Sequence, residues 1–454
     1  MTTDQTTRWR ALLRRRPPTI ARWACFVAAF AVFVVLLFAR GGPNPAEVDA
    51  KSVTEPAAAI SHGEIAAAVR ATAVPDPPGY PLLTAPLVAV LRPWVGSPHW
   101  CSDKPFPSVL RGNGLRFYAT VIGPCSGPES TVASRARPHW YRSQAVLAVL
   151  AWVLLTVGAV ALLRAAGARR GWGEAFLVLL LAALPAANDA ITQSFHPQDM
   201  ASVGFACLAL ALVLGGRTAA GGIAFAAGFL CKQFAILPLV AAVVAVGGWR
   251  ARTRLLLCFA GVVSIVMAPF EFADPSQFPH TISGVYVVGA GIVHSPTLLG
   301  LLPIAEQMKL ELTRDLPVLV AAVVAVLARW RWREHLLEPV ALIGLATACM
   351  ALRLVFEVAL LDYYFLAVAT LLLILDFALA RPPALSAGWI LSTRFVLAPA
   401  APHLPSSLTA MVFAGLACAP VAIGLAAIQR QARASAARGT ALGVVARPRT
   451  QAFG

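Results

Sequence analysis

Asp49 is an acidic residue whose position in the sequence could serve catalysis. It follows the first apolar run, Ala24 to Phe38, by about ten residues. A carboxylate held at a membrane surface could remove a proton from a hydroxyl group and so act as a general base. The alternative is an aspartate in a solvated loop, and both interpretations fit the sequence.

A short polar motif, Phe195-His196-Pro197-Gln198-Asp199, joins two apolar runs. A proline followed by an acidic residue is typical of the first turn of a helix. Because the N-terminus of a helix attracts anions, His196 could donate to a phosphate there. Asp199 could hold a metal or a sugar hydroxyl instead. The motif therefore predicts either a plain helix start or a helix start that also binds a ligand.

Lys232 is a third candidate, because it is the only lysine in the apolar stretch from Thr218 to Gly248. A cation in such surroundings is costly unless its side chain reaches water or a partner. One interpretation is a lysine that extends to the membrane surface from a helix end. The other is a lysine that contacts a phosphate.

Arg353 stands four residues before Glu357, near the end of another apolar run, and Asp362-Tyr363-Tyr364 follow. The spacing of the two charges is that of a local ion pair on a helix, and tyrosines are common at membrane boundaries. The same residues could also form a subsite for an anion and a sugar. Both interpretations remain open at the level of the sequence.

These residues belong to a chain that is too apolar for a soluble fold. Of its 454 residues, 58% are hydrophobic and only 13% are charged, whereas a soluble domain carries about 25% charged residues. The net charge of +16 would suggest nucleic-acid binding in a soluble protein, but here the basic residues are expected to mark membrane topology. The composition predicts an all-α, polytopic membrane protein with no nucleic-acid partner.

The elements that must position the candidate residues are membrane-spanning helices. A span needs about 20 apolar residues, and the apolar runs predict about twelve crossings, within a range of about 10 to 13. The runs are 24–38, 143–163, 175–187, 200–214, two within 218–248, 255–270, 317–327, 336–350, 365–380, 388–401 and 408–428. The first run resembles a signal peptide, but no small-residue cleavage site follows it, so we interpret it as an uncleaved helix.

Arginine-rich loops orient these crossings, because basic residues favour the cytoplasmic side. The predicted organisation is a basic cytoplasmic N-terminus (1–23), a membrane domain (24–428) that includes a long external loop (40–142), and a basic cytoplasmic tail (429–454). The cytoplasmic side then carries 22 Lys/Arg and 5 Asp/Glu, and the external side 14 and 16. We expect a plasma-membrane protein with both termini inside, whose basic face contacts anionic lipids.

The apolar stretch from Thr218 to Gly248 is too long for one ordinary span, and arginines flank both of its ends. Arg217 precedes the stretch and Arg250 follows it, so both ends are expected on the cytoplasmic side. The stretch therefore predicts a tight hairpin of two short helices. Lys232 lies at or near its external tip.

Two cysteines, Cys101 and Cys125, lie in the long external loop. Because the outside of the cell is oxidising, they could form a disulfide, and the alternative is two unpaired thiols. The other six cysteines lie in or beside apolar runs and are expected to be small core residues. No spacing typical of a zinc site occurs.

The order of these features resembles the GT-C superfamily of integral-membrane glycosyltransferases, in particular actinobacterial polyprenyl-phosphate-mannose-dependent mannosyltransferases and their uncharacterised relatives. Asp49 takes the place of the acidic residue in the family's long first external loop. Tyr80-Pro81 is similar to a Tyr-Pro-Pro motif, and His196–Asp199 to a His-Pro-Glu-Asp motif. The Gly-rich segment from Gly221 to Lys232 is also similar.

This resemblance implies a GT-C fold that transfers a mannose- or arabinose-class sugar from a polyprenyl-phosphate donor to an external glycan or lipid acceptor. It implies that Asp49 deprotonates the acceptor and that His196, Lys232 and Arg353 bind the donor phosphate. The implied sugar or acceptor subsite comprises Tyr80, Gln198, Asp199, Asp362, Tyr363 and Tyr364. A divalent cation, Mg²⁺ or Mn²⁺, could be held by Asp49 or Asp199, although the sequence assigns no cofactor.

Two other classes of function compete with an enzyme. About twelve crossings are common in transporters and flippases, which usually contain two similar halves. The motifs around His196 and Lys232 are not repeated in the second half of this chain, and the long external loop also favours an enzyme. The third class is a non-catalytic membrane protein with a degenerate site.

Overall fold

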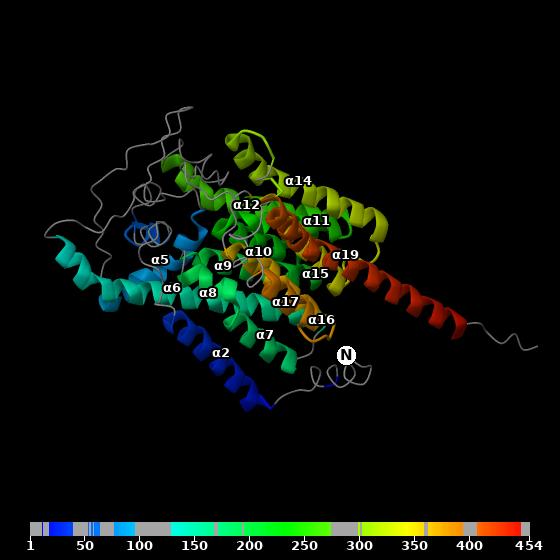
Figure 1. Ribbon diagram of the computed structural model, residues 1–454, viewed down its shortest axis with the longest axis horizontal. Coiled ribbons are helices and arrows are strands. Elements are labelled where there is room, and N and C mark those ends of the chain that lie inside the picture. Colours follow the sequence, from blue (N-terminus) through cyan, green and yellow to red (C-terminus); the bar gives the residue numbers. More distant parts are fainter. Residues whose placement is uncertain are drawn as a thin grey trace, which may run out of the picture.

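The structure is a computed structural model whose described part is an elongated bundle of helices (Figure 1). It describes residues 18–39, 59–63, 77–95, 129–167, 171–192, 195–273, 302–357, 362–393 and 406–445, with the isolated positions 11, 53, 56, 57, 298 and 299. Asp49, Cys101 and Cys125 lie outside the described residues, so the general base and the disulfide stay predictions.

Every regular element in the described ranges is a helix, which confirms the all-α prediction. The first half contains α2 (Thr19–Ala39), α5 (Gly79–Val95), α6 (Glu129–Ala165), α7 (Trp172–Ala182), α8 (Pro185–Thr192), α9 (Pro197–Leu214), α10 (Thr218–Cys231), η1 (Gln233–Ala235) and α11 (Ile236–Ala245). The second half contains α12 (Trp249–Ala273), α14 (Glu306–Trp332), α15 (Pro339–Phe356), η2 (Asp362–Tyr364), α16 (Phe365–Ala378), α17 (Ala384–Leu391) and α19 (Ser406–Val445).

Seven helical segments in the described part are long and apolar enough to cross a membrane. They are Thr19–Ala39, Gln144–Ala165, Trp172–Thr192, Pro197–Leu214, Trp249–Phe272, Pro339–Phe356 and Met411–Ala437. Four shorter apolar helices accompany them, namely Gly79–Val90, Thr218–Cys231, Gln233–Ala245 and Phe365–Ala378. The architecture is therefore that of a polytopic membrane protein.

Two pairs of helices cross at glycines, which lets their backbones touch. A Cβ added to Gly158 of α6 would lie only 1.9 Å from the carbonyl oxygen of Gly204 in α9. In the second pair, a Cβ on Gly424 of α19 would lie 2.2 Å from the carbonyl oxygen of Gly344 in α15. Small residues at such crossings are how membrane helices pack closely. The α6–α9 and α15–α19 pairs are thus the tightest contacts of the bundle.

The stretch between Thr218 and Gly248 forms two short helices that meet at Lys232, as predicted. Gly222 near the start of α10 packs on Leu255 near the start of α12. The Arg252 guanidinium of α12 in turn donates to the carbonyl oxygen of Val246 at the end of α11, at 2.9 Å. The two helices therefore begin and end at the same end of the bundle, which confirms a hairpin. The prediction that it is tight is wrong, because α10 packs mainly on α9 and α12 whereas α11 packs on α14 and α15.

A buried carboxylate ties three helices together at this same end, which we call the arginine end. Glu174 of α7 is 2% exposed and accepts two hydrogen bonds from Arg164 of α6, at 2.9 and 2.7 Å. Arg22 of α2 lies 3.6 Å from the same carboxylate. A paired buried charge is tolerated where an unpaired one would be costly. The first helix is thereby fixed to the bundle.

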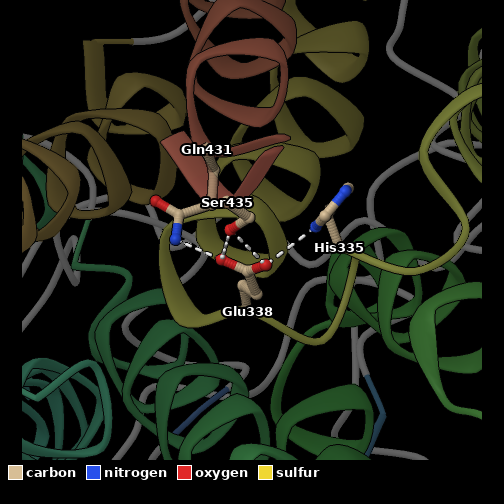
Figure 2. Close-up of polar contacts among 4 residues, drawn as sticks. All are labelled: His335, Glu338, Gln431 and Ser435. Carbon is tan, nitrogen blue, oxygen red and sulfur yellow. Dashed lines mark hydrogen bonds and ion pairs between the residues drawn. The ribbon is translucent and has the colours of Figure 1, made fainter. Parts of the chain in front are cut away.

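A second carboxylate, Glu338, joins the turn before α15 to α19 (Figure 2). The Ser435 hydroxyl donates to both of its carboxylate oxygens, at 2.9 and 3.2 Å. The Gln431 amide donates to Oε2, and His335 Nδ1 lies 2.8 Å from Oε1. These groups are ordered hydroxyl–carboxylate–imidazole, so the serine does not contact the imidazole that would activate a nucleophile. The cluster is a structural link.

We expect this link to weaken in acid. Burial opposes ionisation of Glu338, but hydrogen bonds from Gln431, His335 and Ser435 together lower its pKa below the usual 4.5. A carboxylate with a lowered pKa contributes stability that is present above its unfolded pKa and lost as the pH falls through the folded value. A Glu338→Gln variant should be about 1–3 kcal/mol less stable at pH 7. Thermal unfolding of the solubilised protein between pH 7 and pH 3 measures this.

The difference between the wild type and Glu338→Gln should shrink as the pH falls below about 4.5. Glu334→Gln is the matched control, because Glu334 is an exposed carboxylate in the same turn. That control should change the melting temperature little at any pH. A constant difference across the pH range would show that the Glu338 carboxylate is not what links the two segments.

Candidate functional site

The start of α9 is held in place by an unusual backbone conformation. Phe195 has a φ of 49° although it is not a glycine, and its side chain is fully buried. Such strained backbone conformations persist only where the surrounding packing enforces them, and they concentrate at functional sites. The next residue, His196, is anchored because its backbone N–H donates to the carbonyl oxygen of Ala190 at 2.5 Å. The chain thus places His196 at the helix N-terminus.

His196 is 1% exposed and is oriented by two neighbours. The Gln198 amide nitrogen lies 3.1 Å from its Nδ1, and the Tyr363 ring stacks on the imidazole with centroids 4.3 Å apart and planes at 22°. Because an amide nitrogen can only donate, Nδ1 accepts and Nε2 carries the proton of the neutral ring. His196 can therefore donate a hydrogen bond from Nε2.

Arg353 lies between two aromatic rings near the C-terminus of α15. Its guanidinium carbon is 4.2 Å from the centroid of Tyr364 and 4.7 Å from that of Phe234. Its Nε donates to Glu357 Oε2 at 3.3 Å, which confirms the ion pair predicted from the four-residue spacing. Aromatic faces stabilise a cation without neutralising its charge.

Lys232 occupies the break between α10 and η1, where the backbone is extended. Its side chain is 2% exposed, so the interpretation of a lysine that extends to the surface is wrong. The Ser202 hydroxyl of α9 donates to its carbonyl oxygen at 3.2 Å. Asp199, one turn before Ser202, is also 2% exposed and acts electrostatically on the thiol of Cys231, which precedes Lys232. The two opposite charges thus share one buried neighbourhood.

These contacts close into a ring that joins four parts of the chain. The ring runs from α9 through η2 and α15 to the turn at η1, and returns to α9. Its members, in order, are His196, Tyr363, Tyr364, Arg353, Phe234, Lys232, Ser202 and Asp199. Tyr363 and Tyr364 form its corner, with ring centroids 4.8 Å apart and planes at 86°. We call this group the site ring.

Tyr80 lies at the edge of the site ring and has a structural role. It is fully buried, and its hydroxyl donates to the carbonyl oxygen of Leu147 in α6 at 2.7 Å. Its phenol also lies within electrostatic range of Cys231. Tyr80 therefore fixes α5 against α6, and its one hydroxyl proton is already in use. The side chain of Asp362 lies outside the described residues.

The site ring combines two cationic side chains, Lys232 and Arg353, with two acidic neighbours, Asp199 and Glu357. Besides the hydroxyl groups of the site ring, the side chains of His196, Lys232 and Arg353 can donate hydrogen bonds, and the last two carry a positive charge. Low exposure strengthens such interactions, because the local dielectric constant is lower than that of water. Among the described residues no group of three or more His, Cys, Asp or Glu side chains could hold a metal ion. A divalent cation held by Asp49 or Asp199 therefore stays a prediction.

Sequence reasoning missed three side chains of this region, Phe234, Ser202 and Cys231. Phe234 is an apolar residue in an apolar stretch, so nothing in its type distinguishes it from core. Ser202 lies one turn after Asp199 on α9, and this spacing could have identified it. Cys231 was predicted to be a small core residue, and it is buried at 2% exposure.

Comparisons with protein-family models and with curated proteins find no match to this chain.

Proposed function

We propose that this protein is a membrane glycosyltransferase of the GT-C type. It would move a mannose- or arabinose-class sugar from a polyprenyl-phosphate donor to an external glycan or lipid acceptor. The observation that carries the proposal is the site ring, whose segments bring together the buried His196 and Lys232 and the partly buried Arg353. These side chains come from three separate segments, and each was selected from the sequence as a phosphate contact. Their convergence supports a site for an anionic leaving group.

The proposed transfer is an inverting displacement. The acceptor hydroxyl oxygen attacks the anomeric carbon while its proton passes to the Asp49 carboxylate. The bond between that carbon and the phosphate oxygen breaks, and its electron pair leaves with the polyprenyl phosphate. His196 Nε2–H, Lys232 and Arg353 stabilise the negative charge that develops on the phosphate. No nucleotide-sugar domain is required.

We further propose that the arginine end faces the cytoplasm and the site ring faces outward. Three exposed tryptophans support this orientation, namely Trp23, Trp249 and Trp330, at 67%, 73% and 83% exposure. Each is adjacent to an arginine in the sequence, and they lie near the start of α2, at the start of α12 and near the end of α14, which are the helix ends at the arginine end. Tryptophan at the lipid headgroup level beside basic residues is typical of a cytoplasmic boundary.

A transfer assay tests the function directly. Membranes that contain the protein are incubated with radiolabelled polyprenyl-phosphate mannose or polyprenyl-phosphate arabinose, and the label is followed into glycan and lipid fractions. We expect transfer from one of the two donors. Movement of labelled donor across proteoliposomes without transfer would indicate a flippase or transporter. Neither activity would indicate a membrane protein with a degenerate site.

Within this proposal, Arg353 should contribute to donor binding. In an Arg353→Met variant, methionine fills much of the space between the Phe234 and Tyr364 rings but carries no charge. We expect KM for the donor to rise by about 10- to 100-fold. Arg353→Lys should recover only part of this loss, because lysine lacks the planar fork that stacks on Tyr364. Initial rates at varied donor concentration measure both variants. Equal KM values for Arg353→Met and the wild type would contradict a phosphate contact.

A further inference from the structure

Three arginines converge at the arginine end where α11, α12 and α14 meet, at a place that the proposed sugar transfer does not use. Arg252 of α12 donates to the carbonyl oxygen of Val246, as described above, and Arg329 of α14 donates to that of Val244 at 2.5 Å. Arg333 follows Arg329 by one helical turn. We call these three arginines the arginine junction.

The arginine junction has no acidic partner within the described residues. Arg252 and Arg329 bind only backbone carbonyls there, which the C-terminal end of α11 directs toward them. Burial, followed by repulsion from Arg252 and Arg333, lowers the pKa of Arg329. The three positive charges therefore repel one another and are not neutralised by this part of the chain.

Two carboxylates follow Arg333 in the sequence, Glu334 and Glu338, and neither neutralises the arginine junction. Glu338 accepts hydrogen bonds from Gln431 and Ser435 and contacts His335 (Figure 2). The negative charge of Glu338 is thus already compensated by the groups that link α15 to α19. Glu334, in the same turn, is exposed and forms no ion pair with the arginine junction. The junction is left as a concentrated positive charge.

Two exposed tryptophans flank the arginine junction. Trp249 lies three residues before Arg252, and Trp330 lies directly after Arg329. Indole rings prefer the headgroup level of a bilayer, where one edge meets hydrocarbon and the other meets water. The arginines are thereby expected at the depth of lipid phosphates.

We propose that the arginine junction binds the phosphate group of an anionic membrane lipid. Guanidinium groups recognise phosphate through paired, charge-assisted hydrogen bonds. Exposed Arg333 would meet the headgroup, while Arg252 and Arg329 turn their remaining N–H groups toward the same oxygens. The flanking tryptophans favour a lipid over a free phosphate, because exposed indole rings at this depth would contact acyl chains. The inference rests on the proposed placement of this end at a membrane surface and is independent of sugar transfer.

Thermal unfolding of the purified full chain in a neutral detergent tests the proposal without any sugar donor. The melting temperature is followed while phosphatidylglycerol is added, in parallel with phosphatidylcholine and with inorganic phosphate. We expect a saturable rise with phosphatidylglycerol and little change with the other two. An equal rise with phosphatidylcholine would overturn the charge recognition, and an equal rise with inorganic phosphate would overturn the lipid assignment.

A charge-matched pair of double variants locates the binding. R252Q/R333Q removes two charges from the arginine junction and retains an amide donor at each position, with Arg329 left in place. R430Q/R433Q removes two exposed charges from α19 at the same end. The first variant should weaken apparent affinity for phosphatidylglycerol by about tenfold or more, and the second by less than about twofold. Equal losses in both variants would indicate diffuse attraction and would overturn a defined site.

Discussion

Exchanging Asp49 for asparagine is expected to abolish sugar transfer without lowering the amount of protein in the membrane. Asparagine has nearly the same size and can still form hydrogen bonds, but it cannot accept the acceptor's proton at neutral pH. General-base catalysis contributes about 10²- to 10⁴-fold, so the residual rate should be at or below about one per cent. The measurement is the transfer assay with radiolabelled donor, with protein quantified in the same membranes.

The site ring itself explains why the base is sought at Asp49. Glu357 is bonded to Arg353, and protonating it would leave that cation without its counter-charge. Asp199 lies one helical turn after His196 and shares a buried neighbourhood with Lys232, so it would stand on the side of the leaving phosphate, and an inverting displacement needs its base on the opposite side. These acids are therefore poorly suited to proton removal. For the proposed transfer we therefore place the base in another segment, and Asp49 is the residue that the sequence offers.

Glu47→Gln is the matched control for Asp49→Asn, because it removes one carboxylate from the same short segment. It should keep near-normal transfer. Full activity in Asp49→Asn would refute the assignment. Loss of transfer in Asp362→Asn alone would move the base to the segment that contains η2.

The largest expected effect on stability is at the crossing of α6 and α9. In a Gly158→Ala variant the new methyl group would meet the carbonyl oxygen of Gly204 at 1.9 Å, far below any contact distance. A helix backbone cannot yield as a flexible side chain does, so the two helices must separate. Overpacking of this kind costs about 1–3 kcal/mol, and we expect the upper end of that range. Equilibrium unfolding in mixed detergent micelles measures the loss.

Gly261→Ala supplies the control for Gly158→Ala. Gly261 is also a helical glycine, in α12, but a Cβ there meets nothing within 4 Å. Because alanine is a better helix former than glycine, this variant should be more stable by about 0.5–1 kcal/mol. Similar losses in both variants would mean that the α6–α9 crossing is looser than described.

The fold class could be predicted from the sequence because the hydrophobic effect acts on long runs of residues. Runs such as Pro197–Leu214 are apolar throughout and leave little alternative to a buried or lipid-facing helix. The hairpin at Lys232 was also predictable, since arginines flank both of its ends. The separation of its two arms was not predictable, because α10 and α11 pack on different helices that are distant in the sequence. The break between α7 and α8 was missed for a similar reason, although Pro185 marks it.

The polar residues of the site ring other than Ser202 could be selected from the sequence, but their contacts could not be predicted. His196, Lys232 and Arg353 stand out because each is a polar group in apolar surroundings. Their linkage passes through aromatic faces, in particular Tyr364 between Arg353 and Tyr363, and no spacing in the sequence encodes such contacts. Phe234 was unpredictable on the same ground.

The splayed hairpin has a mechanical consequence. Its first arm, α10, packs on α9, which belongs to the α6–α9 pair, and its second arm, α11, packs on α15, which belongs to the α15–α19 pair. Lys232 therefore lies at the bend between two arms that pack on different helix pairs, and its extended backbone marks the change of direction. A small rotation of one helix pair against the other would change the spacing between His196 and Arg353 without separating either glycine crossing.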